Sequence, residues 1–126
     1  MKTLLAIIEQ GGYPDFTSIY ESLGYNVITA ASMRKAITLL KNHRPDVITA
    51  EFIYSPMYSA RISNLESLFA SLQSHQLTPQ LIIFVVHEIQ HHMDRLETGI
   101  FDIQRLIYPI NEQNLLDCFH LNTSPG

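Results

Sequence analysis

Short apolar runs alternate with amphipathic segments along the chain, and this alternation restricts the fold more than any other feature of the sequence. The first run, residues 3–8, is Thr3 followed by five consecutive apolar residues, and Glu9 and a Gly-Gly pair come after it. Such a run is typical of a parallel strand that is buried on both faces. The next segment repeats apolar side chains at the spacing of one helical face, with Phe16, Ile19, Tyr20 and Leu23 inward. A strand followed by a helix is therefore predicted.

The same unit recurs to the end of the chain. Ser32 is placed to cap the second helix, and Ile110 and Leu115 flank the start of the last one. A loop rich in Ser and Tyr follows the third strand. Five strands that alternate with five amphipathic helices predict a doubly wound α/β fold around a parallel sheet. The later strands are expected at residues 26–30, 46–53, 81–86 and 101–107.

Length and composition narrow the class of protein. The 126 residues suit one domain, which we place at residues 1–121, with a flexible tail at 122–126. Acidic residues outnumber basic ones by 12 to 8 and the basic residues form no run, so no nucleic-acid partner is expected. The charged fraction of 16% is below the typical value of about 25%, which favours a surface partly covered by a protein partner. A single cysteine and no membrane-length apolar stretch predict a cytoplasmic protein that does not enter a membrane.

Residues 87–91 read H-E-I-Q-H and match the H-E-x-x-H motif of zinc metallopeptidases. In that motif, two histidines on one helix bind Zn²⁺ and the glutamate acts as general base. Residues 81–86, LIIFVV, include four β-branched residues, which favour a strand over a helix. We therefore expect a helix that begins near Glu88, with His87 in the turn before it. A zinc peptidase built on His87, Glu88 and His91 is kept as the less favoured alternative.

Two stretches carry a family resemblance. Residues 24–52, GYNVITAASMRKAITLLKNHRPDVITAEF, are similar to the receiver pattern G-Y-x-V-x-x-A, an A-x-x-L-L helix and then R-P-D-L-I-L-L-D. Residues 98–116, TGIFDIQRLIYPINEQNLL, resemble the receiver ending A-G-A-x-D-Y-L-x-K-P-F-x-x-x-E-L-L. The chain thus resembles the receiver domain of two-component response regulators. The resemblance implies a flavodoxin-like (CheY-like) fold with strand order 2-1-3-4-5.

The positions that carry phosphoryl transfer in receivers hold other residues here. The resemblance places Glu51 at the phosphoacceptor position, where receivers have an aspartate. Glu51 either resembles a permanently charged acceptor or is a solvated carboxylate at a strand end. The acidic pair that holds Mg²⁺ corresponds to Glu9 and Gln10, so one acid is lost and the metal site is weakened. We also expect Glu9 and Glu51 to repel each other, so that Glu51→Gln stabilises the fold by about 1 kcal/mol.

The switch positions differ as well. The resemblance places Val85 where receivers have a hydroxyl that contacts the phosphoryl group, and Tyr108 where they have a lysine. Pro109 keeps the receiver proline, and the resemblance implies a cis peptide bond between Tyr108 and Pro109. Because acceptor, metal pair, hydroxyl and lysine have all changed, we expect a pseudo-receiver without phosphotransfer chemistry.

The function predicted from the sequence is therefore a stand-alone, receiver-like signalling protein. It is expected to act through contact with a protein partner, and neither a cofactor nor an enzymatic activity is expected. The resemblance implies a homodimer through the fourth helix, fifth strand and fifth helix. A degenerate but phosphate-accepting, Mg²⁺-dependent regulator is the main alternative. The residues expected on the dimer face are His91, Arg95, Gln104, Leu106, Tyr108 and Gln113.

Overall fold

A parallel sheet of five strands forms the centre of the computed structural model, which describes residues 2–54, 63–96 and 101–120. The strand order is β2-β1-β3-β4-β5, and every neighbouring pair is parallel. This order confirms the predicted fold class. The strands are β1 (Lys2–Ile7), β2 (Tyr25–Ala30), β3 (Val47–Glu51), β4 (Gln80–Val85) and β5 (Asp102–Ile107).

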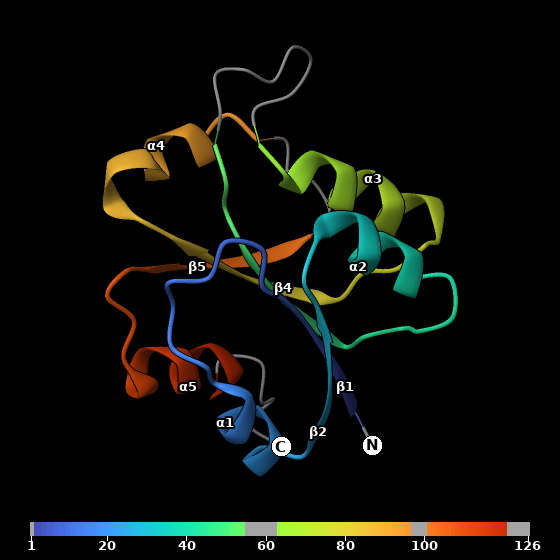
Figure 1. Cartoon of the computed structure of the whole chain (residues 1–126), viewed down its shortest axis with the longest axis horizontal. Coiled ribbons are helices and arrows are strands. Elements are labelled where there is room, and N and C mark those ends of the chain that lie inside the picture. The colour runs from blue at the N-terminus through green and yellow to red at the C-terminus, as the bar shows by residue number, and fades with distance from the viewer. Residues whose placement is uncertain (1, 55–62, 97–100, 121–126) are drawn as a thin grey trace.

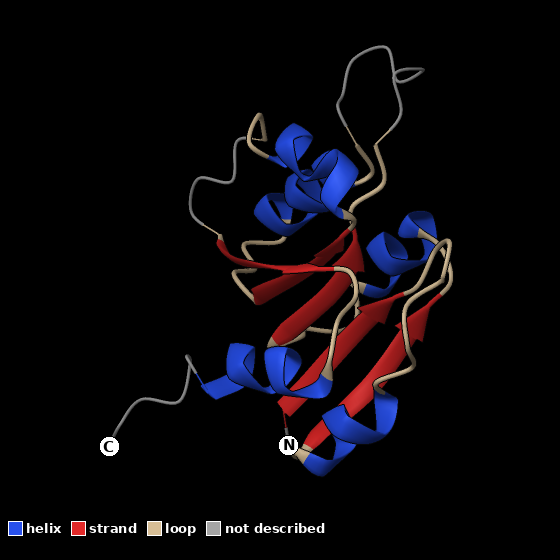
Figure 2. Cartoon of the chain, turned by 90° about the vertical axis from the view of Figure 1, so that its left-hand side faces the viewer, coloured by secondary structure: helices blue, strands red, loops and turns tan. Residues whose placement is uncertain are grey.

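Helices cover both faces of this sheet. Figure 1 shows α1 and α5 on one face and α2, α3 and α4 on the other, and Figure 2 shows the same layers after a quarter turn. This layering is expected for right-handed crossovers, because the connection from β1 to β2 runs along the sheet in the opposite direction to the later ones and so places its helix on the opposite face. The helices are α1 (Thr17–Ser22), α2 (Met33–Leu39), α3 (Leu65–Ser74), α4 (Gln90–Met93) and α5 (Glu112–His120).

Local sequence signals fix several helix ends. The Ser32 hydroxyl accepts a hydrogen bond from the Lys35 amide at 3.1 Å, as the predicted cap of α2 requires. Gly24 ends α1 with a φ of +94°, a left-handed value that favours glycine. Ile110 and Leu115 lie in the same buried cluster at the start of α5, which confirms their predicted packing across the helix start.

The two faces of the sheet bury two separate apolar clusters. Residues of β3 and β4 alternate between them, because successive side chains of a strand point to opposite faces. Ile48, Leu81 and Ile83 lie under α2, α3 and α4, whereas Ile82 lies under α1 and α5. All four are fully buried. This alternation decides which side chains at the carboxyl ends of the strands can meet.

The segment after β4 differs from the prediction. His87 begins a 3₁₀ turn, His87–Ile89, instead of lying in a turn outside any helix, and α4 is only four residues long. Ile89 has φ −116° and ψ 2°, which separates the 3₁₀ turn from α4. Tyr54 and Ser63 form an isolated antiparallel bridge at the base of the loop after β3. The predicted tail, residues 122–126, lies outside the described residues.

Two further observations concern the ends of the sheet and the helices. The Tyr108–Pro109 bond is cis, which confirms what the resemblance implies. None of the helices in the described part of the chain has both the length and the hydrophobicity needed to cross a bilayer.

Candidate functional site

The carboxyl end of β3 carries a buried carboxylate that is held by main-chain amides. Glu51 is only 4% exposed. Its Oε1 accepts hydrogen bonds from the amides of Glu9 at 3.2 Å and Gln10 at 2.8 Å, and its Oε2 accepts one from Gly11 at 3.0 Å. Consecutive amides that converge in this way form an anion-binding concavity. The loop after β1 therefore wraps around the Glu51 side chain.

Gly11 and Gly12 allow this loop to curl. Their φ angles are +79° and +89°, in the left-handed region that side chains other than glycine rarely adopt. The Gly-Gly pair that ends the first apolar run in the sequence thus has a second role. It turns the chain so that three successive amides face one carboxylate.

Asn64 connects Glu51 to Glu9 from the start of α3. Its Nδ2 donates to Glu9 Oε1 at 2.7 Å and to the Glu51 carbonyl oxygen at 2.8 Å, and its Oδ1 accepts from the Ile53 amide at 2.8 Å. Glu9 Oε2 accepts from the Met33 amide at 3.2 Å, at the start of α2. Asn64 is 5% exposed but Glu9 is half-buried, so the network is buried at Asn64 and Glu51 and partly open to water at Glu9. No role was predicted for Asn64 from the sequence. The feature that could have indicated a role is a polar residue directly before the apolar face of a helix.

The same network decides whether the site suits Mg²⁺, the metal that the resemblance implies. Mg²⁺ requires oxygen ligands that are free to coordinate it in octahedral geometry. Both oxygens of Glu9 and both of Glu51 accept hydrogen bonds from protein N–H groups. A metal ion bridging Glu9 and Glu51 would also lie beside the amides of residues 9–11, which direct partial positive charge at this side of the Glu51 carboxylate. These residues do not fit a magnesium site.

The β4 residue beside Glu51 is Phe84. Phe84 pairs with Glu51 in the register of β3 and β4, so both side chains lie on the face covered by α1 and α5. Val85, the predicted switch position, is fully buried in the cluster on the opposite face. A side chain at position 85 therefore points away from the Glu51 carboxylate, and the ring of Phe84 lies on the same face of the sheet as that carboxylate.

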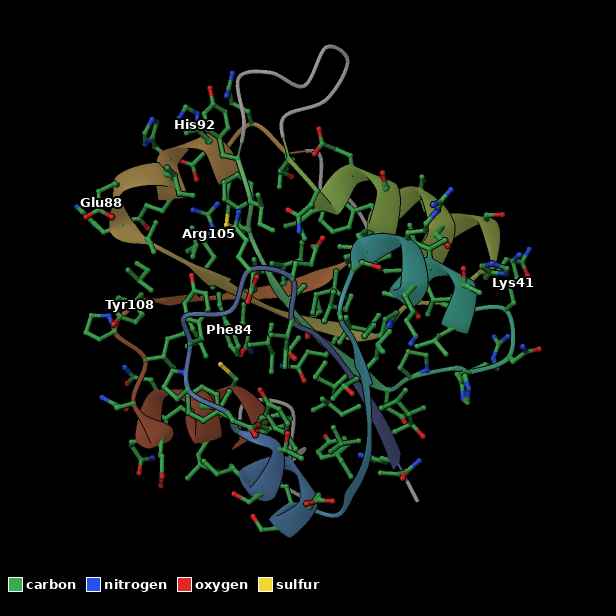
Figure 3. All side chains as sticks on the ribbon, viewed as in Figure 1. Lys41, Phe84, Glu88, His92, Arg105 and Tyr108 are labelled. Atoms are coloured by element: carbon green, nitrogen blue, oxygen red, sulfur yellow. The ribbon has the colours of Figure 1, made fainter. Side chains whose placement is uncertain are left out.

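Aromatic rings continue from Phe84 to the end of β5. The ring of Tyr13 lies 5.3 Å from that of Phe84 and 5.8 Å from that of Tyr108, measured between centroids. Tyr108 is 49% exposed, and Figure 3 shows it at the edge of the molecule beyond Phe84. A phenol ring at this position packs on neighbours and supplies no positive charge. Neither Tyr13 nor Phe84 was expected at the site from the sequence.

The histidine motif does not form a peptidase site. The strand β4 runs to Val85, and His87 lies in the 3₁₀ turn while His91 lies in α4, so no single helix carries both. The His87 ring pairs with the Gln90 side chain at 2.9 Å, and the His91 ring lies 4.0 Å from the His92 ring. Within residues 2–54, 63–96 and 101–120, no group of three or more His, Cys, Asp or Glu is arranged to hold a metal ion.

Only some of the residues predicted for the dimer face are exposed to solvent. Leu106 is 9% exposed and belongs to the core, so it cannot contact a partner, and Gln104 is half-buried. His91, Arg95, Tyr108 and Gln113 are exposed as expected. Ile107, which was not among the expected residues, is 41% exposed beside Tyr108. Between α4 and β5, Arg105 forms an ion pair with Asp94 at 2.7 Å.

Comparison with known proteins adds information on the fold. No protein-family model matches the sequence, and no curated protein sequence matches it. A CheY-like response regulator receiver domain protein of Methanospirillum hungatei is 17% identical, with 96% of this chain and 92% of that chain covered and a TM-score of 0.73. The chemotaxis response regulator CheY4 of Vibrio cholerae is 21% identical, with coverage of 96% and 98% and a TM-score of 0.70.

A third similar structure is the response regulator TrrA of Thermotoga maritima in complex with Mg²⁺ and BeF. It is 19% identical, with coverage of 96% and 98% and a TM-score of 0.65. Structural matches at this level of sequence identity establish the fold of the chain but not the functions of its residues. The parallel sheet of order 2-1-3-4-5 and the nearly complete coverage agree with one another. The chain therefore has the flavodoxin-like fold of CheY-like response regulator receiver domains.

Proposed function

We propose that this chain is a receiver-like signalling protein that acts by binding a protein partner and does not transfer phosphoryl groups. The proposal rests on the burial and the hydrogen bonds of the Glu51 carboxylate. Its carboxylate is almost fully buried, and three amides already hold its two oxygens. An acceptor must be free to attack a phosphoryl donor, whereas this carboxylate takes the position that an anion would occupy.

The surroundings of Glu51 support the same conclusion. Phosphoryl transfer depends almost entirely on positioning and on cations that neutralise the transferred group. The neighbours of Glu51 are the phenylalanine ring of β4 and the neutral ring of Tyr13, and the acids do not fit Mg²⁺. Glu51 in its nest of amides resembles an occupied site, with a charge of −1 in place of the larger charge of an acyl phosphate.

A protein partner is supported by the exposed apolar side chains at the end of β5. Ile107 and Tyr108 are 41% and 49% exposed, and α4, whose end is joined to β5 by the Arg105–Asp94 ion pair, carries two histidines. Tyrosine rings are enriched at protein interfaces because one ring supplies a large contact area at a small cost in conformational entropy. We infer that this edge binds a second copy of the chain or another protein.

The phosphorylation test uses intact mass. The protein is incubated with acetyl phosphate and excess Mg²⁺, alongside a phosphorylatable receiver domain as control for the reagent. We expect the mass to stay unchanged, both for the wild type and for Glu51→Asp, which restores the residue type of receivers but not the other changed positions. A stoichiometric gain of one phosphoryl group that hydroxylamine removes would support the alternative of a phosphate-accepting regulator.

Partner binding is tested by sedimentation velocity over a range of protein concentrations. Association through the end of β5 predicts a species whose weight rises with concentration and falls back to that of the monomer in Tyr108→Arg. The matched control is Ser18→Arg, which adds the same charge at an exposed site on α1. A monomer at every concentration would exclude the homodimer, and equal effects of both variants would exclude this edge as the interface.

A further inference from the structure

A cavity of about 220 Å³ lies beside Glu51, on the face of the sheet covered by α1. The loop from β1 to α1 forms one side of it, and residues of β1, β3 and β4 form the other. One water molecule accounts for about 30 Å³ of liquid volume, so the cavity has room for a ligand of several heavy atoms. Figure 3 shows Phe84, one of its walls, beside this loop.

Four aromatic rings line the cavity and pack against one another. The Phe16 ring lies 6.1 Å from that of Phe84 and 6.5 Å from that of Tyr20, and the Tyr13 ring lies 5.3 Å from that of Phe84. Burial raises the pKa of the Tyr20 phenol, and burial and the nearby Glu51 charge raise that of Tyr13, so both rings are neutral at physiological pH. The faces of neutral aromatic rings attract cations.

The charged side chains of the cavity are all acidic. Asp15 and Glu51 line it, and no lysine, arginine or histidine is among its described lining residues. Asp15 stays ionised well into the acid range, because hydrogen bonds from the Thr17 hydroxyl and amide lower its pKa. The combination of acidic side chains and aromatic walls disfavours an anion and favours a positive charge.

Glu51 offers this charge a direct contact. A carboxylate oxygen has two acceptor positions. Oε1 of Glu51 accepts two amide hydrogens, but Oε2 accepts only the one from Gly11. A carboxylate that is 96% buried thus keeps an acceptor position without a described partner, in a side chain that lines the cavity. A neutral apolar ligand would leave that position unfilled, whereas an ammonium group can fill it.

We propose that this cavity binds a small organic cation: an alkyl- or methylammonium group whose charge faces Glu51 and Asp15 and whose carbon atoms pack among Tyr13, Phe16 and Phe84. The volume suits a free amine of a few carbon atoms or the end of a lysine side chain from a partner protein. Both sources present the same chemistry. The inference is independent of the proposed phosphorylation state and of the interface at β5.

The test is an NMR titration of ¹⁵N-labelled full-length protein with n-butylammonium and tetramethylammonium. tert-Butanol is the neutral ligand of similar shape, and butyrate is the anionic one. We expect saturable shifts at the amides of Tyr13, Thr17 and Glu51 with both cations, and weaker binding of tetramethylammonium, which has no N–H to donate to Glu51 Oε2. The neutral and anionic compounds should cause none at equal concentration. Equal responses to tert-butanol, shifts scattered over the surface, or no saturable response to either cation would overturn the proposal.

Two variants separate the charge from the aromatic wall. Asp15→Asn removes an exposed charge, and Phe84→Leu keeps an apolar side chain but removes the ring; each should weaken binding about threefold to tenfold. Glu21→Gln, an exposed acid on α1 outside the cavity, should bind as the wild type does. If both Asp15→Asn and Phe84→Leu fold and bind with wild-type affinity, the cavity is not the site.

The source of the cation is tested in a second titration arm. Nα-acetyl-lysine methylamide and its Nε-trimethylated form present the ammonium as a protein side chain would. Tighter binding of these than of n-butylammonium favours a partner's lysine, and the reverse order favours a free amine. If no cation gives a saturable response in either titration, the cavity is not a cation site.

Discussion

At the level of single residues, Glu51 holds the loop between β1 and α1 in place. Hydrogen bonds to a charged group contribute about 1.5–3 kcal/mol each, about twice as much as neutral ones. Three amides donate to this one carboxylate, and Asn64 fixes the main chain of the same residue. Repulsion between Glu9 and Glu51 was expected from the sequence, but every oxygen of the two acids has an N–H donor.

This geometry reverses the expected effect of Glu51→Gln. Glutamine keeps one acceptor oxygen, but its NH₂ group must then face the amide of Glu9, Gln10 or Gly11, so one donor opposes another. We expect the free energy of unfolding to fall by about 1–3 kcal/mol, measured by urea denaturation at neutral pH. The control Glu21→Gln removes the same charge at an exposed site and should change stability by less than about 0.5 kcal/mol.

A stability of Glu51→Gln equal to or above that of the wild type would mean that charge repulsion outweighs the amide hydrogen bonds. In that case the control is needed to show that the gain is specific to position 51. Glu51→Asp gives a further comparison, because it keeps the charge and withdraws it by one methylene from the three amides.

Asp15 provides a residue-scale prediction about pH. The hydrogen bond from the Thr17 hydroxyl at 2.7 Å lowers its pKa below the usual 3.8, and that from the Thr17 amide lowers it further. Thr17→Val removes only the hydroxyl, so the Asp15 pKa should rise part of the way towards that value. Carboxyl NMR titration measures the change, and Thr78→Val, at an exposed threonine away from Asp15, should leave it unaltered.

The sign of the effect on stability follows from linkage. A carboxyl group whose pKa is lower in the folded state stabilises the fold above its unfolded pKa, and the contribution is lost as pH falls through the folded pKa. The difference between wild type and Thr17→Val should therefore be present at neutral pH and should shrink below about pH 4. A difference that grows in acid would contradict the assignment of the hydrogen bond.

At the scale of elements, the end of α1 tests the glycine signal. Gly24 has φ +94°, and a Cβ atom built there meets no atom within 4 Å. Any cost of Gly24→Ala thus comes from the backbone conformation and not from a clash. We expect a loss of about 1–2 kcal/mol in the free energy of unfolding. Gly24→Asn should lose less, since asparagine tolerates positive φ; equal stability of wild type and Gly24→Ala would show that φ is not positive in solution.

The elements themselves could be predicted well, for identifiable reasons. The run LIIFVV of β4 has too many β-branched residues to be the first half of a peptidase helix, and the structure confirms a strand. The start of α4 could not be predicted, because it depends on the backbone angles of Ile89 and on the packing of this side chain against the core. Those are tertiary effects, and helical spacing alone does not reveal them.

The site could be predicted from the sequence less completely than the fold could. Glu9 and Glu51 were identified through the resemblance, and both lie in the observed network. Phe84 was missed because a shift of one residue along a strand moves a side chain to the other face of the sheet. Asn64 and Tyr13 were missed for a different reason: their contacts join segments that are far apart in the sequence. Loop geometry sets those contacts.

For the whole molecule, we predict that Mg²⁺ does not affect thermal stability. A ligand that binds only the folded state raises the melting temperature, but the oxygens of Glu9 and Glu51 are engaged by N–H donors. Melting curves of wild type and Glu51→Gln, each with EDTA and with excess Mg²⁺, should give one melting temperature per protein. A large Mg²⁺-dependent rise in the wild type that is absent from the variant would contradict this.

Glu51 can also be regarded as a ligand that the chain supplies to itself. A free anion that competes for the amides of residues 9–11 meets a carboxylate attached to the rigid end of β3, whose local concentration far exceeds that of any cellular solute. The occupancy of these amides is therefore fixed by the covalent structure and does not follow the supply of metabolites. We therefore expect these three amides not to respond to the concentration of a free anion such as phosphate.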